Sequence, residues 1–425
     1  MYIKKINQRV FIIASIVLIV LLCFFAYSSS FKGKFIWDDN FMIRDNELIR
    51  NWRGAGKIFT QDIGYGVGQK VGFYRPLQLI TYMLDYSIWK LRPEGYHLTN
   101  IILHILVGCS VFWLLNLLYA GRFISLLASL LFIVHPAHTE AVAYIAGRAD
   151  ILAALFIVFS FIYYIKYIRS TNKFFYSIML LSYICALLSR ENSLVFSLLL
   201  LGFHWVYKQK LKLKEFFPIA LVSTLYIIFR LGFIRSYPVI DASSIFERLP
   251  GFFYALSSYT RILIFPLGLH MEYGLKLFHF PEPKVIAGII ILSLSLLIII
   301  RQKNRELFVA FFLIWFMFNL LPFSNLYPVT AYMAEHWLYL PSIGFFSVVV
   351  FMLYKHIRSK SICLIVMLII ISFFSYLTIK QTDYWLDPVN FFEKTLSYAP
   401  DSYNLYINLA VAYQDIDQPQ EAIAT

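Results

Sequence analysis

The sequence has few charged residues for its length. Asp, Glu, Lys and Arg make up 14% of the 425 residues, whereas soluble domains contain about 25%. Hydrophobic residues make up 60% of the chain and aromatic residues 19%. This composition excludes a soluble protein with a single membrane anchor, and it predicts an all-α protein that crosses the membrane many times.

Cysteine and the common cofactor motifs are also scarce. The four cysteines all lie inside apolar runs, so a disulfide framework and a zinc site are excluded. His138 and Glu140 form an H-x-E pair, but no P-C-x-x-C follows as in zinc deaminases. No G-x-G-x-x-G and no P-loop occurs. We expect no metal ligand set and no organic cofactor, although the sequence leaves a divalent cation open.

The positive net charge of +13 has a topological explanation. Basic residues lie in short gaps between apolar runs, which is the positive-inside pattern, and nucleic acid is therefore excluded as a partner. These gaps contain Lys4 to Arg9, Lys166 to Lys173, Lys208 to Lys214, Arg301 to Arg305, and Lys355 to Lys360.

Apolar runs long enough for membrane helices recur along residues 1–380 and predict about eleven spans, within a range of about ten to thirteen. The stretch 251–267 is ambiguous. Arg261 and the flanking prolines favour a helix that does not cross, because the basic gap after residue 300 then falls on the cytoplasmic side. The expected spans are 10–27 (a retained signal anchor), 99–118, 123–140, 149–167, 174–189, 192–207, 215–234, 285–300, 306–323, 338–355 and 361–379.

This topology places a large first loop, residues 28–96, and the C-terminus outside the cytoplasm. Residues 389–425 are amphipathic and helix-prone, and the spacing of Pro400, Asn408 and Tyr413 is similar to the start of a tetratricopeptide repeat. A single repeat cannot bury its apolar face. We therefore expect it to pack on the membrane domain or to be truncated relative to a longer array.

Two adjacent carboxylates, Asp38 and Asp39, lie in the first loop. One ionised member would serve as a general base beside aromatic neighbours. The run WDDN (37–40) is also good turn chemistry, so a structural turn is the alternative.

Further ionisable residues cluster at the outer ends of the apolar runs, where charge is costly and usually functional. Arginine is well suited to bind a phosphate group through its forked donors. Interfacial capping and lipid contact are the structural alternatives, and at least one of the arginines is expected to be only structural. The candidates for donor-phosphate and substrate binding are Arg75, His138, Glu140, Arg148, Asp150, Arg190, Glu191 and Glu335.

Several long motifs together resemble one family. FIWDDNFMIRDNELIRNW (35–52), HPAHTEAVAYIAGRADILAALF (135–156), LLSRENSLVF (187–196) and AEHWLYLPSIG (334–344) resemble the transmembrane and tetratricopeptide-repeat proteins, which are GT-C glycosyltransferases. The resemblance covers nearly the whole chain. In one departure, His336 follows Glu335 where the family's run has arginine.

The resemblance implies a GT-C bundle that transfers a hexose such as mannose from a polyprenyl-phosphate donor. The acceptor would be a protein or glycan hydroxyl at the extracytoplasmic face. It also implies an aspartate base in the first outer loop, Asp38 or Asp39, with a slight preference for Asp39. One base and an in-line displacement would invert the anomeric centre. The alternative is a lipid or glycan transporter without transferase activity. Composition and compact loops favour a prokaryotic plasma membrane over the endoplasmic reticulum.

Overall fold

The computed structural model describes residues 8–118, 121–274, except 234–243, and 276–425, except 302–306 and 327–330. Within these ranges the chain forms helices and no strands. The expected contribution of Lys4, Lys5, Lys303 and Arg305 to the basic gaps lies outside the described residues.

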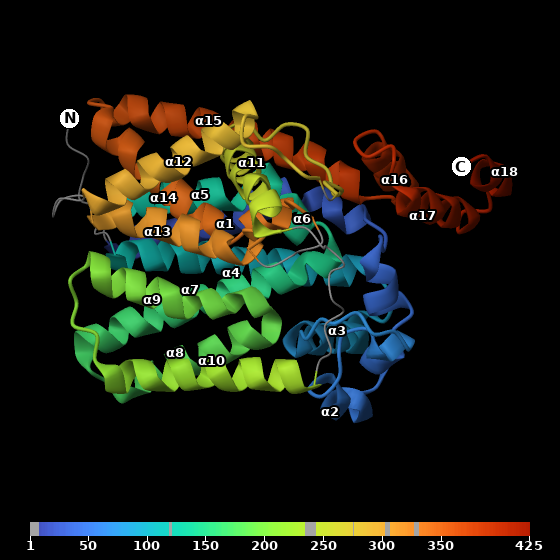
Figure 1. The fold of residues 1–425 in the computed structure, drawn as a ribbon, viewed down its shortest axis with the longest axis horizontal. Helices are drawn as coiled ribbons and strands as arrows, with labels where there is room; N and C mark the ends of the chain where they lie inside the picture. The colour runs from blue at the N-terminus through green and yellow to red at the C-terminus, as the bar shows by residue number, and fades with distance from the viewer. Residues whose placement is uncertain (1–7, 119–120, 234–243, 275, 302–306, 327–330) are drawn as a thin grey trace.

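The long helices lie side by side with their axes along one direction (Figure 1). α7 packs against α8 and α4, α5 against α4 and α14, and α13 against α9 and α14. Gly344 lets α14 approach the α13 backbone at Phe312, because a Cβ there would collide with the Phe312 carbonyl. The helices are α1 (Gln8–Ala26), α4 (Pro93–Leu118), α5 (Arg122–Ile133), α7 (Arg148–Ser170), α8 (Lys173–Ser189), α9 (Val195–Val206), α10 (Leu213–Phe233), α12 (Pro283–Ile300), α13 (Leu307–Leu320), α14 (Pro341–His356) and α15 (Lys360–Thr382).

The chain is a multi-pass membrane protein. Six helices among the described residues are long and apolar enough to cross a membrane, or seven if the bent pair described next is one span. Four shorter apolar helices pack beside them, at Lys173–Ser189, Glu191–Val206, Leu307–Phe323 and Pro341–His356. If these four also cross and the bent pair is one span, the number is the expected eleven, which stays a prediction.

The expected span 123–140 is broken. α5 ends at Ile133, and the chain continues through a 3-10 turn, Pro136–His138, into α6 (Thr139–Val142) at an angle of 56°. A second 3-10 turn, Ile145–Gly147, leads into α7. Gly147 packs so closely on Glu140 and Ala141 that a Cβ would collide with their backbone. This compact double turn brings the polar run 135–150 to one end of the bundle.

α11 (Ile245–Ile264) contains the ambiguous stretch 251–267. It begins with a capping box between Ser244 and Glu247, contains Pro250 and carries Arg261 near its end. It is not among the described helices that are apolar enough to cross a membrane, and Figure 1 shows it tilted against its neighbours. Both observations support the expected non-spanning helix.

The first loop and the C-terminal segment meet at the same end of the bundle (Figure 1). The loop contains α2 (Ala55–Ile58) and α3 (Pro76–Trp89), and the C-terminal segment contains α16 (Pro388–Leu396), α17 (Tyr403–Gln414) and α18 (Pro419–Ala424). Trp37 packs against the rings of Phe391 and Phe392, and the Lys34 ammonium lies 2.7 Å from the Asp387 carboxylate. Tetratricopeptide-like packing of this segment stays a prediction.

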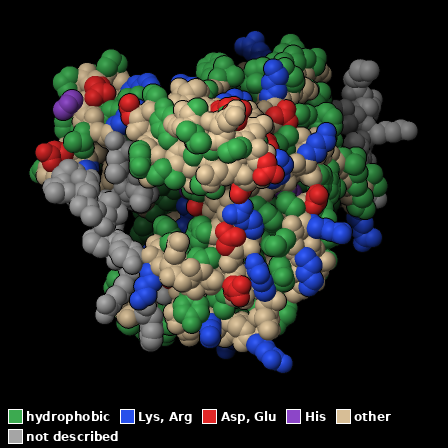
Figure 2. Space-filling view, turned by 90° about the vertical axis from the view of Figure 1, so that its right-hand side faces the viewer, with side chains coloured by type: hydrophobic (Ala, Val, Ile, Leu, Met, Phe, Trp, Pro, Cys, Tyr) green, Lys and Arg blue, Asp and Glu red, His purple; other side chains and the backbone are tan. Residues whose placement is uncertain are grey.

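Figure 2 looks onto this end of the molecule. Basic (Lys, Arg) and acidic (Asp, Glu) side chains are both spread over this end, among apolar and uncharged surface. We call this surface the loop end of the bundle, because the first loop and the C-terminal segment form it.

Candidate functional site

The two loop carboxylates have different surroundings. Asp39 is 1% exposed, and its two carboxylate oxygens accept hydrogen bonds from the backbone N–H groups of Ile36 (3.1 Å) and Ala146 (2.7 Å). Trp37 adopts a positive φ of 50° within this turn. Asp39 therefore closes the WDDN turn and ties it to the turn before α7.

Asp38 has a freer carboxylate. Its backbone N–H donates to the Tyr144 hydroxyl at 3.1 Å. Burial raises the pKa of the Asp38 carboxyl to about 6, while a hydrogen bond from Tyr144 and the charge of Arg75 act in the opposite direction. A carboxylate with a pKa near neutrality is suited to accept a proton.

Two arginines face the same region from different elements. Arg75 immediately precedes α3, and Arg190 lies between α8 and the 3-10 turn Glu191–Leu194. The Arg75 guanidinium lies 3.6 Å from the Glu191 carboxylate, and Arg190 pairs with Asp150. Arg75 Nε is buried and has no hydrogen-bond partner among the described residues. The arginines are thus held by carboxylates, yet Arg75 keeps a free donor.

A histidine and a glutamate complete this cluster. The His336 backbone N–H donates to Glu140 Oε2 at 2.8 Å, and His336 Nδ1 lies 2.5 Å from Glu140 Oε1. Burial and the charges of Arg190 and Arg75 lower the pKa of His336, against the effect of Glu140. We call these residues the charged cluster: Asp38, Arg75, Glu140, Asp150, Arg190, Glu191 and His336.

Glu335 lies behind this cluster. Its carboxylate accepts hydrogen bonds from the His270 backbone N–H (2.6 Å) and the Tyr273 hydroxyl (2.7 Å). Burial, with the nearby charge of Glu140, raises the pKa of Glu335 well above its ordinary value. Glu335 therefore fixes the loop that follows α11 and borders the site.

Arg148 is not brought to the charged cluster. Its guanidinium is fully buried, pairs with Asp85 at 2.6 Å, and donates to Asn100 Oδ1 (2.6 Å) and the Tyr96 carbonyl (3.0 Å). The Tyr82 ring covers one face of the guanidinium. These contacts, with one more to the Thr81 hydroxyl (3.2 Å), use four of the five N–H donors of a fully buried guanidinium, so we expect a structural role for Arg148.

His138 is likewise held by internal contacts. It is 0% exposed, and its ring nitrogens contact the Phe132 carbonyl (2.7 Å) and the Ser342 hydroxyl (3.0 Å). It joins α5 to α14 beneath the site.

The sequence analysis did not single out Tyr144 and Arg230. Tyr144 belongs to the recognised run 135–150, so its place in that run was the available signal. Arg230 lies inside an apolar run, where a lone cation is costly, and it contributes a second positive charge 4.0 Å from Glu191.

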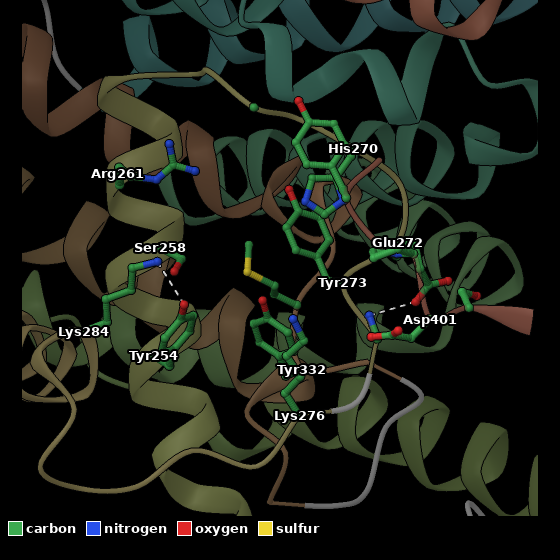
Figure 3. A pocket seen from close by; sticks show the side chains of 17 residues that line it. Tyr254, Ser258, Arg261, His270, Glu272, Tyr273, Lys276, Lys284, Tyr332 and Asp401 are labelled. Atoms are coloured by element: carbon green, nitrogen blue, oxygen red, sulfur yellow. Dashed lines mark hydrogen bonds between the residues drawn. The ribbon is translucent and has the colours of Figure 1, made fainter. Parts of the chain in front are cut away.

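A cavity of about 580 Å³ lies on the other side of Glu335. Figure 3 shows Arg261, Tyr254 and Lys284 on one wall and His270, Tyr273 and Glu272 opposite them. The turn between α16 and α17 closes the cavity, and its Tyr398 stacks on His270 with ring centroids 4.3 Å apart. The cavity is thus bordered by α11, the loop after it, the start of α12 and the C-terminal segment.

In the described part of the chain, no three His, Cys, Asp or Glu side chains lie close enough together to bind a metal ion. Near Asp38 lie the cation of Arg75 and the carboxyl group of Asp39. No step below depends on a divalent cation.

Comparison with curated proteins finds relatives that share nearly the whole chain. A protein O-mannosyl-transferase of Caenorhabditis elegans is 24% identical over 432 residues, which cover 95% of this chain and 60% of the relative. Human protein O-mannosyl-transferase TMTC4 is 25% identical, with 95% of this chain and 64% of the relative covered. This chain thus spans a little over half the length of these relatives. No family model matches.

Among solved structures, the oligosaccharyltransferase of Archaeoglobus fulgidus aligns with a TM-score of 0.53 at 12% identity, over 96% of this chain and 60% of that one. At this identity the match shows the fold alone. The resemblance carried by the sequence motifs is therefore confirmed: the chain is similar over nearly its whole length to the protein O-mannosyl-transferases, and its fold is that of the GT-C glycosyltransferases.

Proposed function

We propose that the protein is a membrane glycosyltransferase that moves a hexose from a polyprenyl-phosphate donor to an acceptor hydroxyl. The observation that carries the proposal is that the charge of Arg75, a partly buried arginine whose Nε has no hydrogen-bond partner among the described residues, acts on the Asp38 carboxylate at one end of an apolar bundle. The relatives are named protein O-mannosyl-transferases, so mannose is the proposed sugar and a protein Ser or Thr the proposed acceptor.

The proposed reaction assigns each group one task. Ionised Asp38 takes the proton from the acceptor hydroxyl, whose oxygen attacks the anomeric carbon. The bond from that carbon to the phosphate oxygen breaks, and the polyprenyl phosphate leaves with one additional negative charge. Arg75 and Arg190 stabilise this charge in a partly dry site. Attack opposite the leaving group inverts the anomeric centre.

The contacts favour Asp38 over Asp39 as the base. Both oxygens of Asp39 already accept backbone N–H groups, and the side chain is 1% exposed. An acceptor hydroxyl would have to displace one of these bonds. Asp39 then acts as a positioning residue that holds the turn on which Asp38 lies.

The proposed orientation places the loop end outside the cytoplasm. The basic residues Arg122, Lys173 and Arg301 lie where α5 and α8 begin and where α12 ends, at the end of the bundle opposite the first loop in Figure 1. The positive-inside rule assigns that opposite end to the cytoplasm. The donor's lipid chain would stay in the bilayer while its phosphate reaches the charged cluster. A prokaryotic plasma membrane remains the proposed location.

The cavity beside Glu335 is the proposed acceptor approach. It has the size of common ligand sites and lies between α11 with its following loop and the C-terminal segment. Its lining contains tyrosines and both charge signs, which suit a polypeptide segment better than a lipid chain.

Transfer by purified protein tests the proposal. The protein is offered radiolabelled polyprenyl-phosphate mannose and other hexoses, together with Ser- and Thr-containing peptides, and carrier cleavage is followed. We expect cleavage by the wild type and a loss of about 10³-fold or more in Asp38→Asn, because the base is removed. Asp45→Asn, in the same loop, serves as the control. Folded protein that binds a lipid-linked sugar without cleaving it would favour the transporter alternative.

A further inference from the structure

His336 belongs to the charged cluster, and the proposed reaction gives no role to its Nε2 atom. The side chain is 21% exposed, and among the residues that the structure describes its Nε2 has no hydrogen-bond partner. Its inner nitrogen and its backbone N–H are both held by Glu140. The ring is therefore oriented with one open nitrogen.

Two aromatic rings, Trp337 and Phe323, connect His336 to Arg190. The His336 ring meets Trp337 edge to face at 5.8 Å between centroids, and Trp337 stacks on Phe323 at 4.5 Å. The Arg190 guanidinium lies 6.0 Å from the centre of the Phe323 ring. The charges of Arg190 and Arg75 both act on His336, which assigns the three groups to the same charged cluster.

Glu140 determines which nitrogen of His336 carries the proton. Because the carboxylate accepts from Nδ1–H, the neutral ring presents an unprotonated Nε2 to the cluster. A phosphate group cannot accept a hydrogen bond from that lone pair. Protonation turns Nε2 into a donor next to Arg75 and Arg190.

We infer that His336 is a third contact to the donor's phosphate and that it binds there as the imidazolium, so that donor binding takes up a proton. This inference rests on the proposed function and names a residue of the same site. Glu140 is then a positioning residue that stabilises the imidazolium. In the empty site the positive charges of Arg75 and Arg190 oppose protonation of His336. The negative charge of a bound phosphate offsets them and favours the protonated ring.

Binding therefore depends on pH with a defined sign. The bound state carries the proton and the empty state loses it as pH rises. Donor affinity should fall with rising pH, by at most about tenfold per pH unit, since one proton is linked to binding. Other titratable and charged groups face the same region, and Asp38, with its pKa of about 6, is the main competitor. These groups are Arg75, Glu140, Asp150, Arg190, Glu191, Arg230 and Glu335.

Calorimetry with a phosphodiester probe isolates the effect. Polyprenyl-phosphate mannose is itself a phosphodiester with no proton to lose between pH 5.5 and 8. Its dissociation constant is measured in detergent, in an Asp38→Asn background that removes both turnover and the Asp38 titration. The variants are His336→Gln, His336→Arg and, as a matched control at the opposite end of α14, His356→Gln. Titrations in two buffers of different ionisation enthalpy give the number of protons taken up on donor binding, and this measurement needs no substitution of His336.

The expected results differ for each variant. The background protein and His356→Gln should bind more weakly as pH rises and take up close to one proton. His336→Gln should bind weakly at every pH, and His336→Arg should bind tightly at every pH, because arginine keeps its charge. A merely structural role for His336 would not make the arginine variant independent of pH.

Two results would overturn the inference in distinguishable ways. Binding that does not vary with pH in the background protein, or that varies equally in His336→Gln, overturns it and leaves the proposed function standing. Failure of every variant to bind the donor at any pH overturns both together.

Discussion

The Tyr144 ring stacks on the Trp385 indole, with centroids 5.3 Å apart and planes inclined by 18°. Tyr144 belongs to the turn before α7, and Trp385 lies just beyond α15, where the chain leaves the bundle. The Tyr144 hydroxyl in turn accepts from the Asp38 backbone at 3.1 Å. The proposed base is therefore positioned by the start of the C-terminal segment as well as by its own loop.

The pH dependence of turnover tests this arrangement. Asp38 must be ionised to accept a proton, and its pKa is raised to about 6 by burial. At saturating donor, the rate of carrier cleavage should rise with pH through about 6. In Tyr144→Phe the rise should move to higher pH, because the Tyr144 hydrogen bond lowers the Asp38 pKa. Tyr403→Phe, at an exposed site, should match the wild type; an unmoved profile in Tyr144→Phe would refute the contact.

Replacing Asp38 and replacing Asp39 should affect the stability of the folded protein differently. The folded-state pKa of Asp38 lies above its unfolded value of about 3.9, so ionisation of Asp38 costs stability as pH rises. Asp38→Asn should therefore unfold at the same or a higher temperature at pH 7.5. Asp39→Asn loses an acceptor for a buried N–H and should cost about 1–3 kcal/mol.

Thermal unfolding in detergent, followed by intrinsic fluorescence, checks both variants. If Asp38→Asn were the less stable of the two while Asp39→Asn lost turnover without loss of stability, the base would have to be reassigned to Asp39.

The helices could be predicted from the sequence to within a few residues because apolar runs bounded by basic gaps dictate them. α15, for example, occupies Lys360–Thr382 against the expected 361–379. The break after α5 could not be predicted, since residues 123–140 read as one apolar run although the His135–Pro136 step bends it.

The sequence located the site residues by type and position but could not sort them by contact. Nothing in the sequence distinguishes Arg75 from Arg148. Only the fold shows that the Arg148 guanidinium binds Asp85 and Asn100, whereas Arg75 Nε has no hydrogen-bond partner among the described residues. Asp38 and Asp39 are adjacent in the sequence, and only the fold shows that backbone N–H groups bind the Asp39 carboxylate and not that of Asp38. The Glu140–His336 pair joins residues 196 positions apart, which no local pattern reports.

The two arginines give a matched pair of variants. Arg148→Ala leaves Asp85 buried without its cation and should destabilise the protein by about 3–5 kcal/mol. The double variant Arg148→Met with Asp85→Leu should recover much of this loss, because no buried charge remains. Arg75→Ala should instead weaken donor binding by about tenfold or more, since Glu191 retains Arg230 as a partner 4.0 Å away.

Unfolding temperature and donor affinity are measured for all three variants. An Arg148→Ala protein of unchanged stability that loses donor binding would return Arg148 to the phosphate site.

The cavity beside Glu335 makes the last prediction. Ala399 lies in the turn that closes the cavity, so a larger side chain there narrows the proposed acceptor approach without touching the charged cluster. In Ala399→Trp the KM for a peptide acceptor should rise about tenfold, while donor affinity stays unchanged, because obstruction removes binding energy from the acceptor alone. Ala424→Trp, on α18, is the control for adding an indole to the C-terminal segment. Equal acceptor kinetics in both variants would show that the acceptor reaches Asp38 by another route, and the tyrosines of the cavity would then have no part in transfer.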